Sequence, residues 1–432
     1  MSMLLQESSA MRERLMHLLA GVLPEAWVGT GVVIGMSLLK ATAIVLVIQI
    51  GMLYATWLER KLIGRMQDRL GPNRIGKFGL LVPFADMIKI LTKEDITPRD
   101  AHSWVYNLGA ILILPPALVG FAVVAFSSTL IAADLSVGLL FFFAIASTAV
   151  IPIFMAGWGS RNKFALIGAM RAVAQIVSYE IPQVLSLVGV LLLAGTLSMN
   201  QLVGSQGPLP APGAEGAVLP GVWYIFLQPI AFVIFLLATT AEIERTPFDL
   251  PEAESEIIAG YHTEYSGIKF GMFYLALYFA TIAAAAVTAM IFLGGWQPPV
   301  PAFLIPESGP ITDFMYNSGW LWMTIKTVFL VMVFMWFRGT LPRLRADQMM
   351  AFCWKILVPL SLANLLVTGL LANLLAPLAS PMAYLGAFVV ANAILLGITL
   401  WAVRRWRERG SSGDFVFEVQ PAAAPSGVGG GD

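Results

Sequence analysis

The densest group of ionisable side chains in the sequence lies between residues 242 and 256. This run, EIERTPFDLPEAESE, contains one cation, Arg245, and six carboxylates: Glu242, Glu244, Asp249, Glu252, Glu254 and Glu256. Clustered carboxylates can store or relay protons, because an acid held against apolar groups has a raised pKa and exchanges protons near neutral pH. Pro247 and Pro251 each remove a backbone donor and restrict the preceding residue, so we expect a structured loop.

A solvated acidic loop is the alternative interpretation of the same run. Such a loop requires no aromatic side chains, yet this one contains Phe248 and continues into GYHTEY, with Tyr261 and Tyr265. Aromatic groups beside carboxylates favour burial of the acids over full hydration. We therefore favour a loop whose acids are held against aromatic side chains.

Two more ionisable residues, Glu180 and Lys326, lie inside apolar stretches. A charge at the centre of a bilayer costs about 2.5–3.5 kcal/mol on insertion scales, so such residues usually have a function. Glu180 is either a proton-transfer group or a plain interhelical hydrogen-bond partner. Lys326 either has a function within its span or extends its ammonium group outward to the interface. Arg171 precedes Glu180 by nine residues, about 180° around an ideal helix, so the two should not pair.

The composition places these residues in a membrane protein. Hydrophobic residues make up 58% of the chain, the mean hydropathy is +0.79, and 26 Lys and Arg balance 26 Asp and Glu. The balanced charge gives no general attraction to nucleic acid. The single cysteine, Cys353, excludes an internal disulfide and a multi-cysteine metal or iron–sulfur site, and the three histidines are dispersed. The sequence has neither a Walker loop nor a dinucleotide-binding fingerprint.

We predict an all-α polytopic fold with about nine transmembrane helices, since nine apolar stretches can cross about 30 Å of hydrocarbon. They cover residues 36–58, 104–130, 137–158, 172–194, 221–241, 268–293, 319–337, 356–376 and 382–403. With the N-terminus outside, most Lys and Arg fall on the cytoplasmic side and the outer connections contain none. The predicted organisation is an N-terminal amphipathic or periplasmic segment (1–35), one transmembrane helical domain (36–409) and a disordered cytoplasmic tail (410–432).

Two elaborate loops, 59–103 and 242–267, fall on the predicted cytoplasmic side. The first continues as LLVPFADMIKIL, which places an apolar face opposite Asp86 and Lys89. That face contains Leu80, Leu81, Phe84, Met87, Ile88 and Leu91. The pattern indicates an amphipathic helix of about three turns, lying either at the membrane interface or on the protein's own cytoplasmic face.

Several separated motifs match one known family over about residues 38–377. In the first loop they are Glu59, Arg60, Lys61, Gly64, Gln67, Arg69, Gly71, Pro72, Asn73 and Asp86. In the fourth span and the acidic loop they are Arg171, Gln175, Ser178, Tyr179, Glu180, Glu242, Arg245, Pro247, Phe248, Asp249, Glu252, Glu254 and Glu256. Near the seventh span they are Lys326, Arg338, Pro342, Arg343 and Arg345. Together these residues resemble the quinone-site membrane subunit of respiratory complex I, the H-subunit family of proton-pumping NADH:quinone oxidoreductases.

The resemblance implies that the cytoplasmic loops and the amphipathic helix dock the peripheral arm and form the quinone entrance. The residues it implies in quinone binding or docking are Glu59, Arg60, Lys61, Arg65, Arg69, Asn73, Phe84, Asp86, Arg245 and Phe248. It also implies a buried chain of acids that couples quinone reduction to proton translocation: Glu180, Glu242, Asp249, Glu252, Glu254 and Glu256. Further charges in the membrane or at its inner surface are Arg171, Lys326, Arg338, Arg343 and Arg345.

The resemblance also implies cofactors and partners. Quinone would be the substrate, while the iron–sulfur clusters and FMN would lie in partner subunits, with no metal or flavin in this chain. The partners would be the peripheral-arm iron–sulfur and quinone-site subunits, small membrane subunits and antiporter-like membrane subunits. The chain would then be a multi-pass protein of the bacterial cytoplasmic (inner) membrane, and a subunit of a translocase with no redox centre of its own.

The sequence departs from the family pattern at three places. Leu277 stands where the family usually has an acid in the sixth span, so one expected proton site is missing. Val82 replaces a common Gln, and Ile151-Pro152 replaces a common Tyr-Gly. We therefore expect the proton route to differ in detail from that of the family.

Two other functions are open at this point. The chain could be the equivalent membrane subunit of an energy-converting hydrogenase or another relative of complex I, and the electron-donating partner would distinguish these. A stand-alone secondary transporter would show inverted repeats and interrupted helices, and the sequence contains neither.

Overall fold

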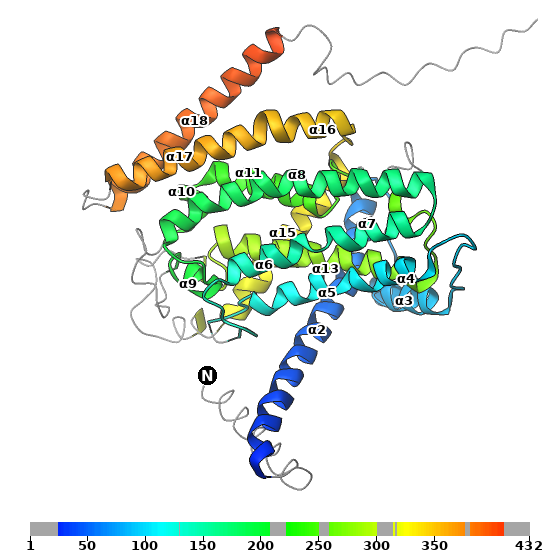
Figure 1. The fold of residues 1–432 in the computed structure, drawn as a ribbon. Helices are drawn as coiled ribbons and strands as arrows, with labels where there is room; N and C mark the ends of the chain where they lie inside the picture. The colour runs from blue at the N-terminus through cyan, green and yellow to red at the C-terminus, as the bar shows by residue number, and fades with distance from the viewer. Residues whose placement is uncertain are drawn as a thin grey trace, which may run out of the picture.

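In the computed structural model of this chain, every regular element among the described residues is a helix (Figure 1). Those residues are 25–128, 130–207, 222–249, 259–299, 314–315, 318–375 and 381–409. In chain order the elements are α2 (Glu25–Met66), η1 (Lys77–Gly79), α3 (Val82–Thr92), α4 (Ser103–Leu112), α5 (Leu114–Val119), η2 (Gly120–Val123), α6 (Gly138–Ser147), α7 (Val150–Gly159), α8 (Lys163–Ala194), α9 (Met199–Gly204), α10 (Tyr224–Leu227), α11 (Pro229–Glu242), η3 (Gly260–His262), α13 (Gly267–Phe292), α15 (Gly319–Thr340), α16 (Ala346–Phe352), η5 (Cys353–Leu357), α17 (Val358–Leu375) and α18 (Pro381–Arg409). Residues 1–24, the predicted tail and the acids Glu252, Glu254 and Glu256 lie outside the described residues.

Within the described ranges, seven helical segments are long and apolar enough to cross a membrane, which confirms an all-α polytopic fold. They are Ser37–Met66, Ser103–Val123, Gly138–Gly159, Lys163–Ala194, Gly267–Phe292, Gly319–Thr340 and Ala346–Leu374. Two shorter apolar helices, Pro229–Glu242 and Leu385–Trp401, lie where the fifth and ninth spans are predicted.

Helix α2 is longer than the first predicted span at both ends. It begins at Glu25 and ends at Met66, so part of the predicted N-terminal segment belongs to it. The stretch WLERKLIGRM is rich in Leu, Arg, Lys, Glu and Met, which favour helix, and no proline follows until Pro72. The prediction of a loop from residue 59 was therefore wrong for four candidate residues, which lie on the helix: Glu59, Arg60, Lys61 and Arg65.

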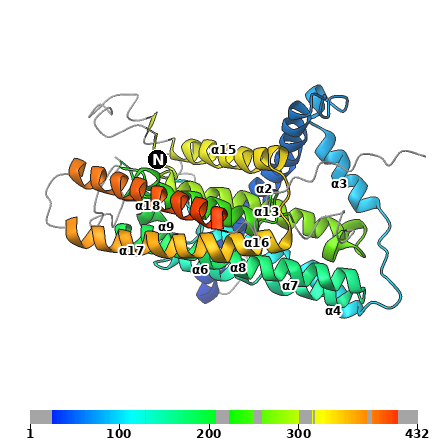
Figure 2. The ribbon, with the colours of Figure 1, turned by 90° about the horizontal axis from the view of Figure 1, so that it is seen from above.

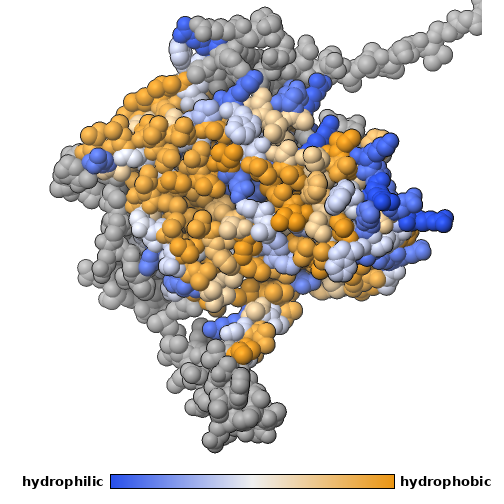
Figure 3. Space-filling view, viewed as in Figure 1, coloured by the Kyte–Doolittle hydropathy of each residue, from blue (hydrophilic) through white to orange (hydrophobic). Residues whose placement is uncertain are grey.

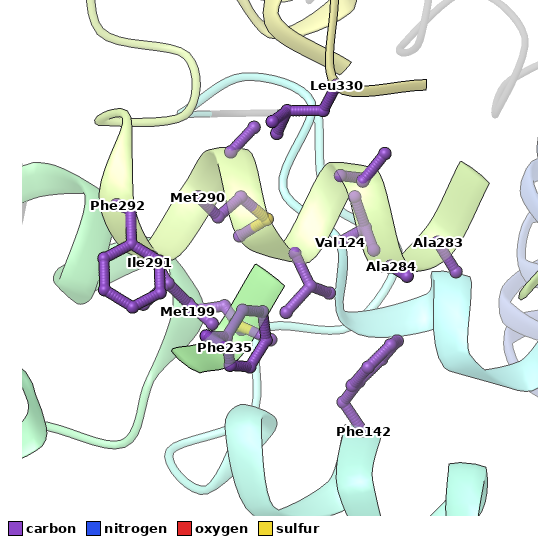
Figure 4. Close-up of a cluster of buried hydrophobic side chains, with 14 of the residues drawn as sticks. Val124, Phe142, Met199, Phe235, Ala283, Ala284, Met290, Ile291, Phe292 and Leu330 are labelled. Atoms are coloured by element: carbon purple, nitrogen blue, oxygen red, sulfur yellow. The ribbon is translucent and has the colours of Figure 1, made fainter. Parts of the chain in front are cut away.

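Helix α13 is the central helix of the bundle. In its most apolar 18-residue stretch 78% of the residues are buried, against 11% in α2. It contacts α2, α3, α4, α5, α9, α11 and α15. Four consecutive alanines, 283–286, allow these neighbours to approach its backbone closely. Figure 4 shows this core, where Phe142, Met199 and Phe235 from three other helices pack beside α13.

Helix α8 supplies a buried polar face within the apolar bundle. It begins at an Asn162 cap, whose side chain accepts a hydrogen bond from the Phe164 N–H, and ends at Gly195, which has a left-handed φ of 67°. Figures 1 and 2 show α8 running beside α17, and it also contacts α7 and α11. Its buried polar residues are Gln175, Ser178, Gln183 and Ser186.

The outer surface separates apolar flanks from a charged end. In Figure 3 apolar atoms cover the flank formed by the long helices, and hydrophilic atoms gather at the end of the bundle where α3 and α4 lie in Figure 1. Lipid-facing helices require such an apolar belt, because the hydrocarbon region cannot solvate charged groups.

Candidate functional site

A buried ionic cluster around Glu59 of α2 is the centre of the site. Glu59 Oε1 accepts hydrogen bonds from Arg245 Nη1, at 2.8 Å, and from Arg338 Nη1. Its Oε2 accepts a hydrogen bond from the Tyr278 hydroxyl at 2.6 Å. An isolated buried carboxylate costs several kcal/mol, so these three partners are what allow Glu59 to remain ionised. The Glu59 cluster, defined by these four residues, joins α2, α13, α15 and the segment after α11.

Arg245 is the buried cation of the Glu59 cluster. Its guanidinium carbon lies 4.8 Å from the centroid of the Tyr278 ring, within the range of a cation–π contact. Burial lowers the pKa of Arg245, but the Glu59 carboxylate, Tyr278 and Tyr274 together raise it more, and the net pKa is raised. Two further donors, Nε and Nη2, are buried with no hydrogen-bond partner among the described residues. This cation therefore has donor capacity beyond its bond to Glu59.

A second ion pair connects the acidic run to the segment before α16. Asp249 Oδ2 accepts a hydrogen bond from Arg343 Nη2 at 2.7 Å, and the Asp249 side chain is only 4% exposed. Burial raises the pKa of Asp249, Arg343 lowers it, and the net pKa is raised. The Leu344 N–H also donates to the Pro247 carbonyl oxygen at 3.1 Å. Residues 243–249 are buried, so this part of the acidic run is a structured loop and not a solvated one.

Helix α8 holds the acidic loop from the other side. The Gln175 side-chain amide donates to the carbonyl oxygens of Ala241 and Phe248, each at 2.7 Å. The Phe248 side chain is 1% exposed and its ring centroid lies 5.2 Å from that of Tyr179. Phe248 is thus a packing residue of the loop in this chain, and its burial fixes the positions of Arg245 and Asp249 on either side of it.

A cavity of about 120 Å³ lies between α5, α6, α7, α8, α11 and α13. Most of its lining is apolar, but Gln183, Thr239, Glu242 and Glu244 also face it. Since one water molecule needs a volume of about 10–15 Å³, the cavity has room for several. It is therefore a compartment inside the membrane domain in which carboxylates and water can meet.

One of the predicted proton-relay acids, Glu242, lines this cavity. Gln183 Nε2 donates to Glu242 Oε2 at 2.6 Å and to Thr239 Oγ1 at 3.1 Å. Glu180 lies one helical turn before Gln183 on α8 and accepts a hydrogen bond from the Ser147 hydroxyl of α6. Glu180 thus has an interhelical hydrogen bond. It also lies one helical turn from Gln183, whose side chain binds Glu242.

A second, smaller pocket of about 10 Å³ adjoins the Glu59 cluster. Its lining residues are Glu244, Arg245, Thr246, Asp249, Tyr274, Leu277 and Arg338. Glu244 and Leu277 also line the large cavity. These two residues therefore form the boundary between the small pocket beside the Glu59 cluster and the large cavity that Glu242 lines.

The aromatic residues after the acidic run pack in the interior. The Tyr261 hydroxyl donates to Glu244 Oε2 at 3.0 Å, and Tyr265 stacks on Tyr106 with 4.1 Å between ring centroids. Burial lowers the pKa of His262 to about 3, so its imidazole is neutral at physiological pH. His262 therefore acts here as a packing residue and does not add positive charge to the acidic loop.

Exposed charges connect the end of α2 to α3. Arg60 Nη1 donates to Asp86 Oδ2 at 2.5 Å, and Lys89 Nζ donates to Asp86 Oδ1 at 2.9 Å. Burial raises the pKa of Asp86, but the hydrogen bonds from Lys89 and Arg60 lower it more, and the net pKa is lowered. Helix α3 is amphipathic and about three turns long, as predicted.

The apolar face of α3 points away from the described part of the chain. Leu81, Ile88 and Leu91 are 53%, 57% and 58% exposed, and Phe84 is 38% exposed. Helix α3 nevertheless packs on α2 and α13, with Pro83 buried, so its exposed apolar residues lie on the side away from these two helices. The face is available to lipid or to a partner subunit.

The remaining candidates in the first loop do not join the Glu59 cluster. Arg65, Arg69 and Asn73 are exposed, and Arg69 Nε donates to the side chain of its neighbour Gln67 at 2.8 Å. Lys61 Nζ lies 6.0 Å from the centroid of the Trp57 ring, on the same helix. The structure thus divides the predicted quinone and docking residues into a buried set and a solvent-facing set.

Lys326 lies at the far end of α15 from Arg338 and serves a different part of the molecule. Its Nζ donates to the carbonyl oxygens of Leu293, Gly295 and Gln297, at 2.5, 2.9 and 2.7 Å. The ammonium group is therefore anchored to carbonyl groups at and just beyond the C-terminal end of α13, where such groups carry partial negative charge.

Two other predicted charges lie apart from the Glu59 cluster. Arg171 is half-buried on α8, and Arg345 is exposed at the start of α16, where its backbone N–H donates to the Gln348 side chain at 3.3 Å. Among the described residues, no group of three or more His, Cys, Asp or Glu side chains is placed to hold a metal ion.

Four residues of the site were not among the sequence candidates: Gln183, Glu244, Tyr261 and Tyr278. Tyr274 and Tyr278 are four residues apart and so share one face of α13, but nothing in that spacing indicates a bond to Glu59. Glu244 lies in the acidic run, yet only the fold distinguishes it from its neighbours by placing it against two cavities.

Comparison with known proteins identifies the family. A family model described as NADH dehydrogenase matches residues 39–369. A protein of Dehalococcoides mccartyi (strain CBDB1), named as the H subunit of NADH-quinone oxidoreductase, is 49% identical over 321 residues, which are 74% of this chain and 82% of the relative. The protein with the same name from Bacillus cytotoxicus is 45% identical over 319 residues, 74% of this chain and 88% of the relative. A Geobacter sulfurreducens protein, named as the second H subunit of NADH-quinone oxidoreductase, is 44% identical over 325 residues, 73% of this chain and 90% of the relative.

The family model covers all four residues of the Glu59 cluster, and the matches confirm the family that the sequence motifs predict. The chain belongs to the H-subunit family of NADH-quinone oxidoreductases, the membrane subunits of that oxidoreductase complex.

Proposed function

We propose that this chain forms the quinone cavity of a proton-pumping NADH:quinone oxidoreductase and the acidic relay that couples quinone reduction to proton translocation. The observation that carries the proposal is the position of the buried Glu59 cluster near a cavity lined by Glu242 and by Gln183, which lies one helical turn from Glu180. Buried cations next to carboxylates that can exchange protons provide what quinone reduction needs from a protein without redox groups.

Reduction of a quinone to a quinol consumes two electrons and two protons. With one cysteine and three histidines, this chain cannot hold a four-cysteine iron–sulfur cluster, so the electrons come from a partner subunit. Arg245 has buried donors beyond its bond to Glu59, which suit the carbonyl oxygen of a quinone as negative charge develops on it. Neutralising that charge with protons then changes the electrostatic balance of the Glu59 cluster.

The carboxylates carry the coupling in this proposal. A change of charge on a quinone bound beside Arg245 alters the free energy of ionisation of Asp249 and Glu242, since buried charges interact strongly at short range. Glu242 passes a proton through water in the large cavity toward Glu180, with Gln183 fixing the Glu242 carboxylate. Glu252, Glu254 and Glu256 would extend the same chain of acids.

The distribution of Lys and Arg along the sequence indicates which side of the membrane this site faces. We place the loops at the end of α2 and after α11 on the cytoplasmic side of a bacterial inner membrane, because the opposite connections contain no Lys or Arg. The exposed apolar face of α3, with Arg60 and Lys89 near it, then suits the peripheral-arm subunits that bring the iron–sulfur clusters and, further away, FMN. Antiporter-like subunits would receive the protons within the membrane.

Photoaffinity labelling with a photoreactive quinone tests the quinone site in the purified complex. Labelled peptides are expected from residues 59–103 or 242–267, and an excess of unmodified quinone should prevent the labelling. Labelling confined to other segments, or to other subunits only, would contradict the assignment of the quinone cavity to this chain.

A further inference from the structure

Glu244 lies between the two cavities of the site. Its side chain is 5% exposed and lines both the cavity of about 120 Å³ and the pocket of about 10 Å³. Leu277 of α13 is the other residue that lines both. The boundary between the Glu59 cluster and the Glu242 cavity therefore contains one carboxylate and one apolar side chain.

The backbone and the hydrogen bond from Tyr261 help to hold Glu244 in this position. Its φ of 49° lies in the left-handed region, which a non-glycine residue rarely adopts and which is often kept at functional sites. Its N–H donates to the Ala241 carbonyl oxygen at 3.2 Å, and its Oε2 accepts a hydrogen bond from Tyr261 at 3.0 Å. The carboxylate is thus fixed by its surroundings at the boundary.

We propose that Glu244 carries protons across this boundary, between the Glu59 cluster and the cavity that contains Glu242, an inference that rests on the proposed function. The Glu244 carboxylate accepts a proton on the side of the small pocket and releases one into the large cavity. The carboxyl group then returns to its starting state with no net change. Leu277 cannot exchange protons, so it leaves Glu244 as the titratable group of the boundary.

The small pocket has room on the order of one water molecule, and the large cavity has room for several. A proton can therefore reach Glu244 from the ionic side through a single water and leave it through water on the other side. Glu242 lies two residues before Glu244 and faces the same large cavity, which makes it the next acceptor.

A purely structural role for Glu244 is the alternative, because its carboxylate accepts the Tyr261 hydrogen bond. The two roles respond differently to substitution. In Glu244→Gln the amide oxygen still accepts from Tyr261, but the group no longer titrates. In Glu244→Asp the titrating group is kept on a shorter side chain. In Glu244→Gln with Leu277→Glu, a carboxyl group returns to the same boundary from α13.

The test measures NADH-driven proton translocation by the complete complex in proteoliposomes. Glu244→Gln should lower the rate by at least about tenfold, since a positioned proton-transfer group typically contributes about 100-fold to 10,000-fold. Glu244→Asp should retain most of the rate, and adding Leu277→Glu should restore part of what Glu244→Gln loses. Asp134→Asn, which removes an exposed acid at another part of the chain, is the matched control and should pump like the wild type.

Parallel measurement of Glu242→Gln separates this inference from the function on which it rests. Normal pumping in Glu244→Gln with impaired pumping in Glu242→Gln would overturn the inference and leave the relay standing. Normal pumping in both would remove the relay as well. A loss in Glu244→Gln that neither Glu244→Asp nor Leu277→Glu repairs would assign Glu244 a structural role and overturn the inference.

A measurement on the wild-type complex does not depend on whether a variant assembles. A hydrophobic carbodiimide reacts with protonated carboxyl groups in apolar surroundings. Mass spectrometry should find Glu244 modified, with the modified fraction following the loss of pumping. Modification of Glu242 without modification of Glu244 would contradict the inference.

Discussion

Glu59 and Arg245 are 186 residues apart in the sequence, and their side chains meet at 2.8 Å inside the protein. Each side chain is only 4% exposed. The pair is therefore buried and differs from solvent-exposed ion pairs, which contribute little to stability. Removing one member of a buried pair leaves the other as an uncompensated charge. This relationship makes the pair both a structural connection between α2 and the acidic loop and a sensitive point for mutation.

Glu59→Gln should destabilise the complex by about 3–5 kcal/mol, because Arg245 and Arg338 lose their common anion. The measurement is the midpoint temperature at which the purified complex loses this subunit or its quinone reductase activity. Glu94→Gln, an identical substitution at an exposed site, is the control and should leave the midpoint unchanged.

A double-mutant cycle makes this prediction specific to the pair. Arg245→Met alone should also destabilise the complex, but Glu59→Gln combined with Arg245→Met should cost less than the sum of the two. Strict additivity would mean that the two side chains do not interact in the assembled complex, and would contradict the buried pair.

Arg60→Ala should slow quinone reduction without loss of stability. The Arg60–Asp86 pair is partly exposed, with the Arg60 side chain 52% accessible, and such pairs contribute at most about 1 kcal/mol. Its loss nevertheless removes the charged contact between α3 and the end of α2, which lies at the proposed quinone entrance. Steady-state kinetics of Arg60→Ala should show a raised apparent KM for quinone. A second variant, Arg69→Ala, tests whether the exposed cations act in docking.

The control for Arg60→Ala and Arg69→Ala is Arg74→Ala, which removes an exposed cation between α2 and η1. Wild-type kinetics in Arg60→Ala and Arg69→Ala, in complexes that assemble fully, would count against a role of this surface in quinone entry or docking.

Much of the fold follows from the sequence, because span length and apolar composition are local properties. Among the described residues, seven of the nine predicted spans form as long apolar helical segments, and the amphipathic helix α3 forms where it is predicted. The end of α2 was missed because charged residues were taken to mark a loop, although Glu, Lys and Arg favour helix once it emerges from the apolar region.

The site could be predicted only as a set of residue types. Glu59 and Arg338 are 279 residues apart, and Asp249 and Arg343 are 94 apart, so only tertiary packing decides which carboxylate each cation meets. Lys326 illustrates the same limit: its three carbonyl partners are backbone groups, which carry no signal in the sequence.

Protonation of His262 should destabilise the protein at low pH. Burial lowers the pKa of His262 from 6.5 to about 3, so between these values the unfolded chain binds a proton that the folded chain does not. Stability therefore rises with pH over this window, by up to about 1.4 kcal/mol per pH unit from this group, and its contribution levels off above about pH 6.5.

Thermal stability measured between about pH 5 and pH 7.5 tests the prediction, since this range covers the upper part of the window and the plateau above it. His262→Phe keeps an aromatic ring beside Phe273 but removes the titrating group, so its stability should depend less steeply on pH than that of the wild type. Equal slopes would show that His262 is solvated in the assembled complex.

The central claim is that buried carboxylates of this chain connect quinone reduction to proton translocation. The most direct measurement is the number of protons pumped per NADH oxidised by Glu242→Gln and Glu180→Gln complexes in proteoliposomes, with Asp134→Asn as control. We expect both variants to assemble but to lose most proton translocation and coupled quinone reduction, while the control keeps them. Wild-type turnover and wild-type pumping in both variants would contradict the claim.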